Sequence, residues 1–128
     1  MKQHNPEGVA APISAYSHGI EVPPGARWLT VSGQVGIDSG GALAPDAAGQ
    51  SEVIWQNISR ILATAGMGIG DIVKMTAYLV DPADLAAYGA VRTRYLGDHR
   101  PASSLVYVSG LVKPEMKLEV EVQAARAD

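Results

Sequence analysis

The chain has 128 residues, of which 47% are hydrophobic and 18% are charged, a balance typical of one soluble globular domain. Its formal net charge is −3 and its ten Lys and Arg residues are scattered, so we expect no basic surface for nucleic acid. The absence of Cys excludes disulfides, thiolate metal sites and a cysteine nucleophile. No apolar run suits a signal peptide or a membrane span, so we expect one cytoplasmic domain over residues 1–128.

The first part of the chain predicts short strands separated by turns. Tyr16–Val22 and Arg27–Ser32 are compatible with strands and flank the turn residues Pro23–Gly25, so we interpret them as a hairpin. Gln34–Ile37 is a third short strand by the same criteria, followed by a segment rich in turn residues.

Two helices are predicted from apolar residues that recur at helical spacing. The first ends at Gly66, and its apolar stripe comprises Val53, Ile54, Ile58, Ile61, Leu62 and Ala65. The second covers Pro82–Gly97, with Asp81 as the N-cap and proline at the first helical position. Its stripe comprises Leu85, Tyr88, Val91, Tyr95 and Leu96.

Three more segments predict strands in the second half of the chain. Asp71–Val80 is rich in β-branched and aromatic residues and predicts a central strand. Ser104–Val108 and Met116–Ala124 follow, and the latter alternates cleanly between apolar and polar residues. The order β-β-β-α-β-α-β-β predicts an α+β fold with a single mixed sheet and both helices packed on one face.

Several short motifs stand in the order and spacing of the landmarks of a known family. These motifs are Tyr16-Ser17-His18-Gly19, Ser32-Gly33-Gln34, Asn57, Ala65-Gly66, Asp71–Thr76, Pro101-Ala102-Ser103-Ser104 and Leu118–Glu121. Together they cover nearly the whole chain, which on this basis resembles the Rid (RidA/YjgF) family. The resemblance implies a fold like that of AroH-type chorismate mutase, and a homotrimer that holds small molecules in clefts between its subunits.

The same resemblance implies an activity and a set of site residues. The founding members of the family hydrolyse reactive enamines and imines to 2-keto acids and ammonia without a cofactor. Glu119 matches the glutamate near the imine carbon and is the candidate acid/base residue, while Glu121 shares its strand face and is the alternative. The candidate substrate-binding residues are Tyr16, Gly33, Ser103 and Ser104.

One motif departs from the family's pattern at a position that bears on the chemistry. Ser103 stands where the founding members carry an arginine that holds the substrate carboxylate. Because hydrogen bonds to charged groups contribute roughly 1.5–3 kcal/mol each, we expect this loss to weaken binding of a 2-imino acid by about ten- to a hundredfold or more. Arg100 lies three residues earlier, where strand alternation directs it away, and Gly89 replaces an asparagine that is frequent in the family.

Each candidate residue also has a purely structural interpretation. Glu119 fits a solvated strand face, Tyr16 fits an aromatic that covers the core, and Gly33 fits a strand end that needs an unusual torsion. The three histidines show no metal-ligand spacing, so we expect no metal. Three functions therefore stay open: a cofactor-independent hydrolase or deaminase of imines or enamines, a non-catalytic trimer that binds a small carboxylate or imine, and an endoribonuclease, which the acidic net charge disfavours.

Overall fold

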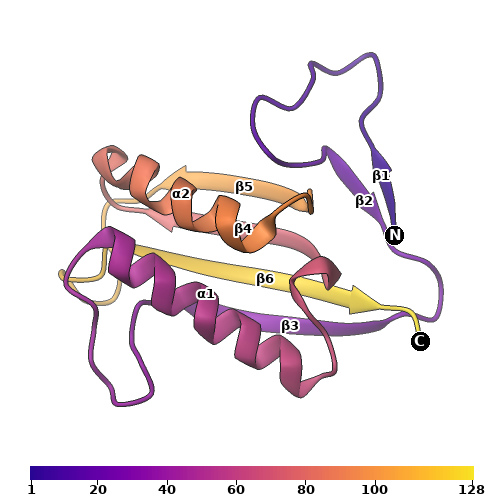
Figure 1. Cartoon of the computed structure of the whole chain (residues 1–128). Coiled ribbons are helices and arrows are strands. Elements are labelled where there is room, and N and C mark those ends of the chain that lie inside the picture. The colour runs from indigo at the N-terminus through magenta and orange to yellow at the C-terminus, as the bar shows by residue number, and fades with distance from the viewer.

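The architecture is a four-stranded mixed sheet covered on one face by two helices, with a separate two-stranded sheet at one end (Figure 1). The computed structural model describes residues 1–128. The larger sheet has the order β3-β6-β4-β5, with strands β3 (Arg27–Gln34), β4 (Ile72–Leu79), β5 (Ala102–Tyr107) and β6 (Leu118–Arg126). Only β4 and β5 are parallel, joined by a helical crossover. The predicted α+β class and the central position of β4 are therefore confirmed.

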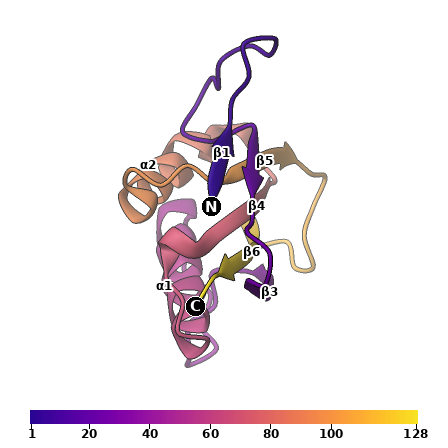
Figure 2. The ribbon, with the colours of Figure 1, turned by 90° about the vertical axis from the view of Figure 1, so that its right-hand side faces the viewer.

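Both helices, α1 (Ala47–Thr64) and α2 (Leu85–Leu96), lie on the same face of the sheet (Figure 2). Asp46 caps α1, since its carboxylate accepts a hydrogen bond of 2.7 Å from a backbone N–H of the first turn. Asp81 caps a 3₁₀ turn, η2 (Pro82–Asp84), so α2 proper begins three residues later than predicted. Neither helix combines the length and the apolar character needed to cross a lipid bilayer.

The core lies between the two helices and the sheet. The predicted stripe of α1 supplies Ile54, Ile58 and Leu62, all fully buried, and the apolar face of β6 supplies Leu118, Val120, Val122 and Ala124. In α2, Tyr88, Val91 and Leu96 are buried. Leu85 was predicted to join them, but it is 41% exposed at the start of the helix.

No helix covers the opposite face of the sheet (Figure 2). Strand alternation places the half-buried Glu119 and Glu121 of β6 on this face, next to Lys74, Thr76 and Tyr78 of β4. The Tyr78 hydroxyl donates a hydrogen bond to Glu121, and this bond, followed by burial, raises the pKa of Tyr78. We call this surface the open face; at its centre, polar groups such as Tyr78 and Glu121 are already paired.

The pairing of the N-terminal strands differs from the prediction. Strand β2 (Gly19–Glu21) pairs with β1 (Lys2–His4), and β3 pairs with β6. The segments Tyr16–Val22 and Arg27–Ser32 therefore do not form a hairpin, and two sheets replace the single one expected. The physical reason is that pairing with β6 brings Val31, only 2% exposed, into the core, where a two-stranded hairpin would leave it solvated.

The third strand predicted at Gln34–Ile37 is also absent. Strand β3 ends at Gln34, and Ile37 forms only an isolated bridge to Leu43. At Gly36 the backbone passes so close to α1 that a Cβ atom would lie 2.6 Å from the Cα of Gln50. The buried Gln50 amide makes three hydrogen bonds to backbone groups of two neighbouring loops, so side-chain bonds replace strand pairing here.

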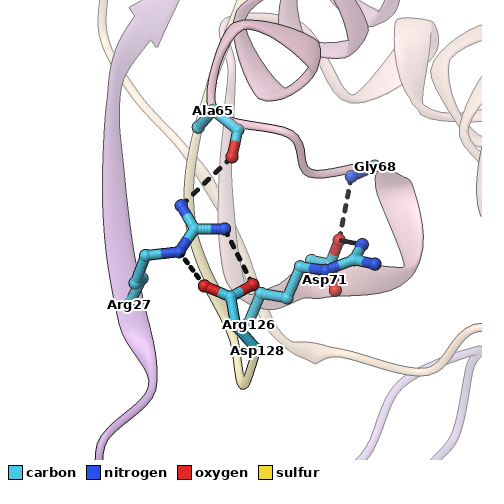
Figure 3. A network of polar contacts seen from close by, with 6 residues as sticks. All are labelled: Arg27, Ala65, Gly68, Asp71, Arg126 and Asp128. Atoms are coloured by element: carbon cyan, nitrogen blue, oxygen red, sulfur yellow. Dashed lines mark hydrogen bonds and ion pairs between the residues drawn. The ribbon is translucent and has the colours of Figure 1, made fainter.

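A polar network fastens the end of β6 to the rest of the molecule (Figure 3). Arg27 of β3 donates to Asp128 at 2.5 Å and to a carbonyl at the end of α1, while Arg126 lies 3.3 Å from Asp71 in the 3₁₀ turn η1 (Ile69–Asp71). The bond to Asp128 raises the pKa of Arg27, and the same bond lowers the pKa of Asp128. Because these pairs are largely solvated, they fix the position of the strand end and add little stability.

Candidate functional site

A cavity of about 490 Å³ lies between α2, β5 and the segment that precedes β2. Its lining comprises Ile13, Ser14, Ala15, Tyr16, Leu85, Tyr88, Gly89, Arg92, Thr93, Ser103 and Leu105. Two of the predicted substrate-binding residues, Tyr16 and Ser103, thus line one cavity. So does Gly89, and a Cβ atom added there would meet nothing within 4 Å. Ser103 and Gly89, where we expect departures from the family's pattern, are therefore small residues beside the same space.

Hydrogen bonds to the start of β5 place Tyr16 beside Ser103. The neighbouring Ser17 is 1% exposed, and its backbone N–H donates to the carbonyl of Pro101 at 3.1 Å. Its hydroxyl donates to the carbonyl of Arg100 at 2.6 Å. These two bonds fix the segment before β2 along the strand that carries Ser103, which explains how residues far apart in sequence meet at the cavity.

Arg92 is the charged residue of this lining. The residue is only 9% exposed, and its Nη2 atom donates to the carbonyl of Ala15 at 2.9 Å. Burial lowers the pKa of Arg92, and the nearby positive charge of Arg100 lowers it further. No acidic side chain lines the cavity and no carboxylate lies within ion-pair distance of Arg92. A buried positive charge is therefore left without a negative partner.

Tyr88, one helical turn before Arg92, adds a polar group to the same wall. Its hydroxyl oxygen is buried and makes no hydrogen bond of ordinary geometry, although the Arg92 guanidinium lies near enough to act on it. Burial raises the pKa of Tyr88 to about 12, although the charge of Arg92 acts in the opposite direction. At neutral pH the hydroxyl is therefore protonated and is free to donate a hydrogen bond.

Glu119 and Gly33 meet on the open face, away from this cavity. A Cβ atom at position 33 would lie 2.1 Å from Oε2 and 2.7 Å from Cδ of Glu119, so glycine leaves the space that the carboxylate occupies. The pairing of β3 with β6 is irregular between Val31 and Gln34, which includes this position. Gly33 was predicted to bind substrate; within one chain the group closest to it on this side is the Glu119 carboxylate.

Ser104 and Ser103 lie on opposite sides of β5, because neighbouring strand residues alternate in direction. Ser104 Oγ accepts a hydrogen bond of 2.7 Å from Lys74 Nζ, on the open face. The five predicted site residues thus form two groups separated by the sheet: Tyr16 and Ser103 at the cavity, and Gly33, Ser104 and Glu119 on the open face. The sequence alone did not single out Lys74, Tyr88 or Arg92.

Arg100 and His18 have structural roles. Arg100 donates to the carbonyls of Gly97 and His99, at 2.7 and 3.1 Å, and does not line the cavity. Strand β5 begins only at Ala102, so strand alternation does not set the direction of the Arg100 side chain. The His18 ring lies 2.6 Å from a backbone carbonyl and packs edge-on against Tyr16. No three His, Asp or Glu side chains converge as metal ligands.

Comparison with known sequences shows extended similarity. The sequence profile of the family described as Endoribonuclease L-PSP matches residues 7–126. The chain is 35% identical over 124 residues to the 2-iminobutanoate/2-iminopropanoate deaminase of Salmonella typhimurium, with 94% of each chain covered. It is 34% identical over 120 residues to a RutC family protein of Pyrococcus horikoshii, with 92% of each chain covered.

Solved structures agree with the sequence comparison. The fold matches the Rid family protein YyfB from Yersinia pestis with a TM-score of 0.86 and 31% identity, over 98% of both chains. It matches E. coli TdcF, solved with bound serine, with a TM-score of 0.74 and 29% identity, over 99% of this chain and 100% of that one. Since sequence and fold agree over nearly the full length, the chain belongs to the Rid (YjgF) family.

Proposed function

We propose that this protein binds a small metabolite in clefts between the subunits of a homotrimer, where it adds water to an imine, an enamine or a related double bond. The observation that carries this proposal is the separation of the candidate residues into two groups. Tyr16 and Ser103 line the cavity, whereas Glu119 lies against Gly33 on the open face. The sheet stands between the groups, so a neighbouring subunit would have to bring its open face to the cavity to complete the site.

The open face has the properties of a subunit interface. It lacks a covering layer, and it displays large apolar side chains at Trp28, 56% exposed, and Val106, 43% exposed. Between them lie half-buried polar groups, including the Tyr78–Glu121 hydrogen bond. Exposed apolar residues that border polar ones are typical of surfaces that bind another protein, and a closed ring of three would cover all three sheets at once.

Glu119 is the proposed acid/base residue. Its carboxylate would orient a water molecule whose oxygen bonds to the carbon of a C=N group, while a proton passes through the carboxylate to the nitrogen. The resulting carbinolamine then expels ammonia as its hydroxyl proton moves to the leaving nitrogen, which leaves a carbonyl compound. These steps need no cofactor. The similarity to a 2-iminobutanoate/2-iminopropanoate deaminase supports this reaction class.

A role in binding without turnover is the second candidate. The serine at position 103 favours it, because one neutral hydroxyl replaces a charged, two-pronged donor. The structure of TdcF with bound serine supports small-molecule binding by proteins of this fold. A ligand that raises the thermal midpoint without being converted would indicate this role.

The test uses freshly generated 2-iminopropionate, with semicarbazide to trap the imine that escapes hydrolysis. We expect wild type to accelerate hydrolysis and Glu119→Gln to lose about a hundredfold or more of that activity, since general acid–base catalysis typically contributes about 10²–10⁴-fold. Glu121→Gln is the matched control: it removes the same charge from the same strand face and should remain active. Sedimentation of each variant checks that the trimer is intact.

Three results would contradict the proposal. Full activity of Glu119→Gln would remove this residue from the mechanism, and loss of activity in Glu121→Gln alone would transfer the role to that neighbour. Sedimentation of wild type as a monomer at micromolar concentration would overturn the intersubunit site, whichever residue is catalytic.

A further inference from the structure

The cavity beside α2 contains a charge that the proposed mechanism does not use. Arg92 is 9% exposed, and the one hydrogen bond recorded for its guanidinium is donated to the neutral carbonyl of Ala15. A guanidinium carries five N–H donors and remains protonated at neutral pH. Burying a charge is costly unless an opposite charge accompanies it. Within one chain no such charge lies at this cavity. The Glu119 carboxylate that a neighbouring subunit would bring is assigned to the water, so a ligand is the natural partner of Arg92.

The rest of the lining defines the kind of ligand that would fit. Leu85, Leu105 and Ile13 offer apolar surface, and the hydroxyls of Tyr16, Tyr88 and Ser103 offer neutral polar contacts. None of these side chains is negatively charged. This composition suits a small anion that carries a short apolar group, with the anionic end at Arg92.

We propose that Arg92 supplies, from α2, the positive charge that holds the carboxylate of a small ligand in this cavity, in place of a charge at position 103. The inference rests on the proposed function only in taking this cavity as half of the proposed site; the charge and its surroundings belong to one chain. Arg92 would be a specificity-determining residue, because it selects anionic over neutral ligands.

The two small residues of the cavity support this assignment. Ser103 and Gly89 leave open space beside Arg92, and a Cβ atom at Gly89 would have no neighbour within 4 Å. A second arginine at position 103 would place two positive charges in one buried space, where each would disfavour the ionised form of the other. A guanidinium on the helix and a serine on the strand are therefore compatible, whereas two guanidinium groups are not.

The structural alternative is that Arg92 serves only to hold the segment around Ala15 in place. That role would affect charged and neutral ligands equally, since it shapes the cavity wall. A role in charge recognition would affect only the anion. The comparison of two ligands that differ in charge but not in shape separates these roles.

The experiment measures the affinity of 2-oxobutanoate and of its neutral amide, 2-oxobutanamide, by titration calorimetry. We expect Arg92→Gln to bind 2-oxobutanoate about 10- to 100-fold more weakly than wild type, as removal of hydrogen bonds to a charged group predicts, and to bind the amide unchanged. Arg92→Lys should retain part of the preference for the anion. The double variant Arg92→Gln/Ser103→Arg should recover it, because the charge returns to the same cavity from the strand.

Several outcomes would overturn the inference: equal weakening of both ligands in Arg92→Gln, no preference of wild type for the anion, or no binding of either ligand. The imine hydrolysis assay separates this inference from the proposed function. If Arg92→Gln hydrolyses 2-iminopropionate with unchanged kcat/KM, the inference falls and the catalytic proposal stands. If wild type binds 2-oxobutanoate through Arg92 but hydrolyses no imine, the inference stands and the catalytic proposal falls.

Discussion

Replacement of Tyr88 by phenylalanine should stabilise the protein at neutral pH. Tyr88 is 1% exposed, and its buried hydroxyl oxygen makes no hydrogen bond of ordinary geometry. An unsatisfied buried polar group costs about 1–3 kcal/mol, which the variant would recover. The small void left by the missing oxygen offsets part of this gain. After this offset, we expect the free energy of unfolding to rise by about 1 kcal/mol at pH 7, near the lower end of the range.

The stabilisation should grow at alkaline pH. Burial raises the pKa of Tyr88 from 10.0 in the unfolded chain to about 12 in the folded one. The Tyr88 hydroxyl therefore keeps its proton to a higher pH in the folded state than in the unfolded chain. The contribution of this group to stability is fully present below pH 10 and is lost as pH rises through 12. At pH 11 the loss is about 1.4 kcal/mol, one pKa unit, and phenylalanine does not suffer it.

Urea denaturation at pH 7 and pH 11, at one protein concentration, measures both effects. Tyr107→Phe is the matched control, because Tyr107 is 47% exposed and its hydroxyl makes no hydrogen bond. The stability of this variant should match that of wild type at pH 7. A Tyr88→Phe variant less stable than wild type at pH 7 would refute the assignment of an unsatisfied hydroxyl. A stability difference that does not widen by pH 11 would refute the raised pKa of Tyr88.

Three glycine substitutions test the space around the backbone, two at close approaches and one in open space. Gly33→Ala should push the flexible Glu119 carboxylate aside. It should lower kcat/KM for imine hydrolysis at least about tenfold, which corresponds to about 1.4 kcal/mol in the barrier. The urea midpoint should change little. Unchanged kcat/KM would contradict this. Gly36→Ala should cost about 1–3 kcal/mol of stability, because its Cβ would meet the backbone of Gln50 at 2.6 Å. Gly89→Ala, in a helix and in open space, should instead add about 0.5–1 kcal/mol. Urea midpoints in the opposite order would show that these approaches are misassigned.

Local sequence patterns correctly predicted the buried side of elements that bury a single face. The alternation in β6 and the stripe of Ile54, Ile58 and Leu62 in α1 both predicted the buried side correctly. The burial of Trp55 was not predicted, although this residue is fully buried. Helix α1 packs against α2 as well as against the sheet, so it buries a wider part of its circumference. Trp55 accordingly stacks on Tyr95 of α2, with ring centroids 6.0 Å apart. The partner of β3 could not be predicted, since a hairpin is favoured by sequence proximity and β6 lies at the far end of the chain.

The candidate site was predictable only where a motif carried it. Ser103 and Gly89 indicated a changed pocket, and both line the cavity. Arg92 gave no signal, because a single arginine in a helix that mixes apolar and polar residues is normally solvated. Its burial depends on the carbonyl of Ala15, which reaches it only through tertiary packing. The sequence gives the type of each residue, but whether that residue is buried depends on neighbours that are distant in the sequence.

The strand order also has a consequence for synthesis on the ribosome. Strand β6, the last to be made, lies between β3 and β4, so β3 has no partner in the sheet until the end of the chain is available. During most of its translation, the nascent chain therefore exposes the unpaired strand β3 and the apolar faces of the helices that β6 will later cover. Unpaired edges of this kind favour association between chains and slow the closing of the sheet. We expect this protein to depend on chaperones during synthesis more than after it, and chains truncated before β6 to aggregate rather than fold.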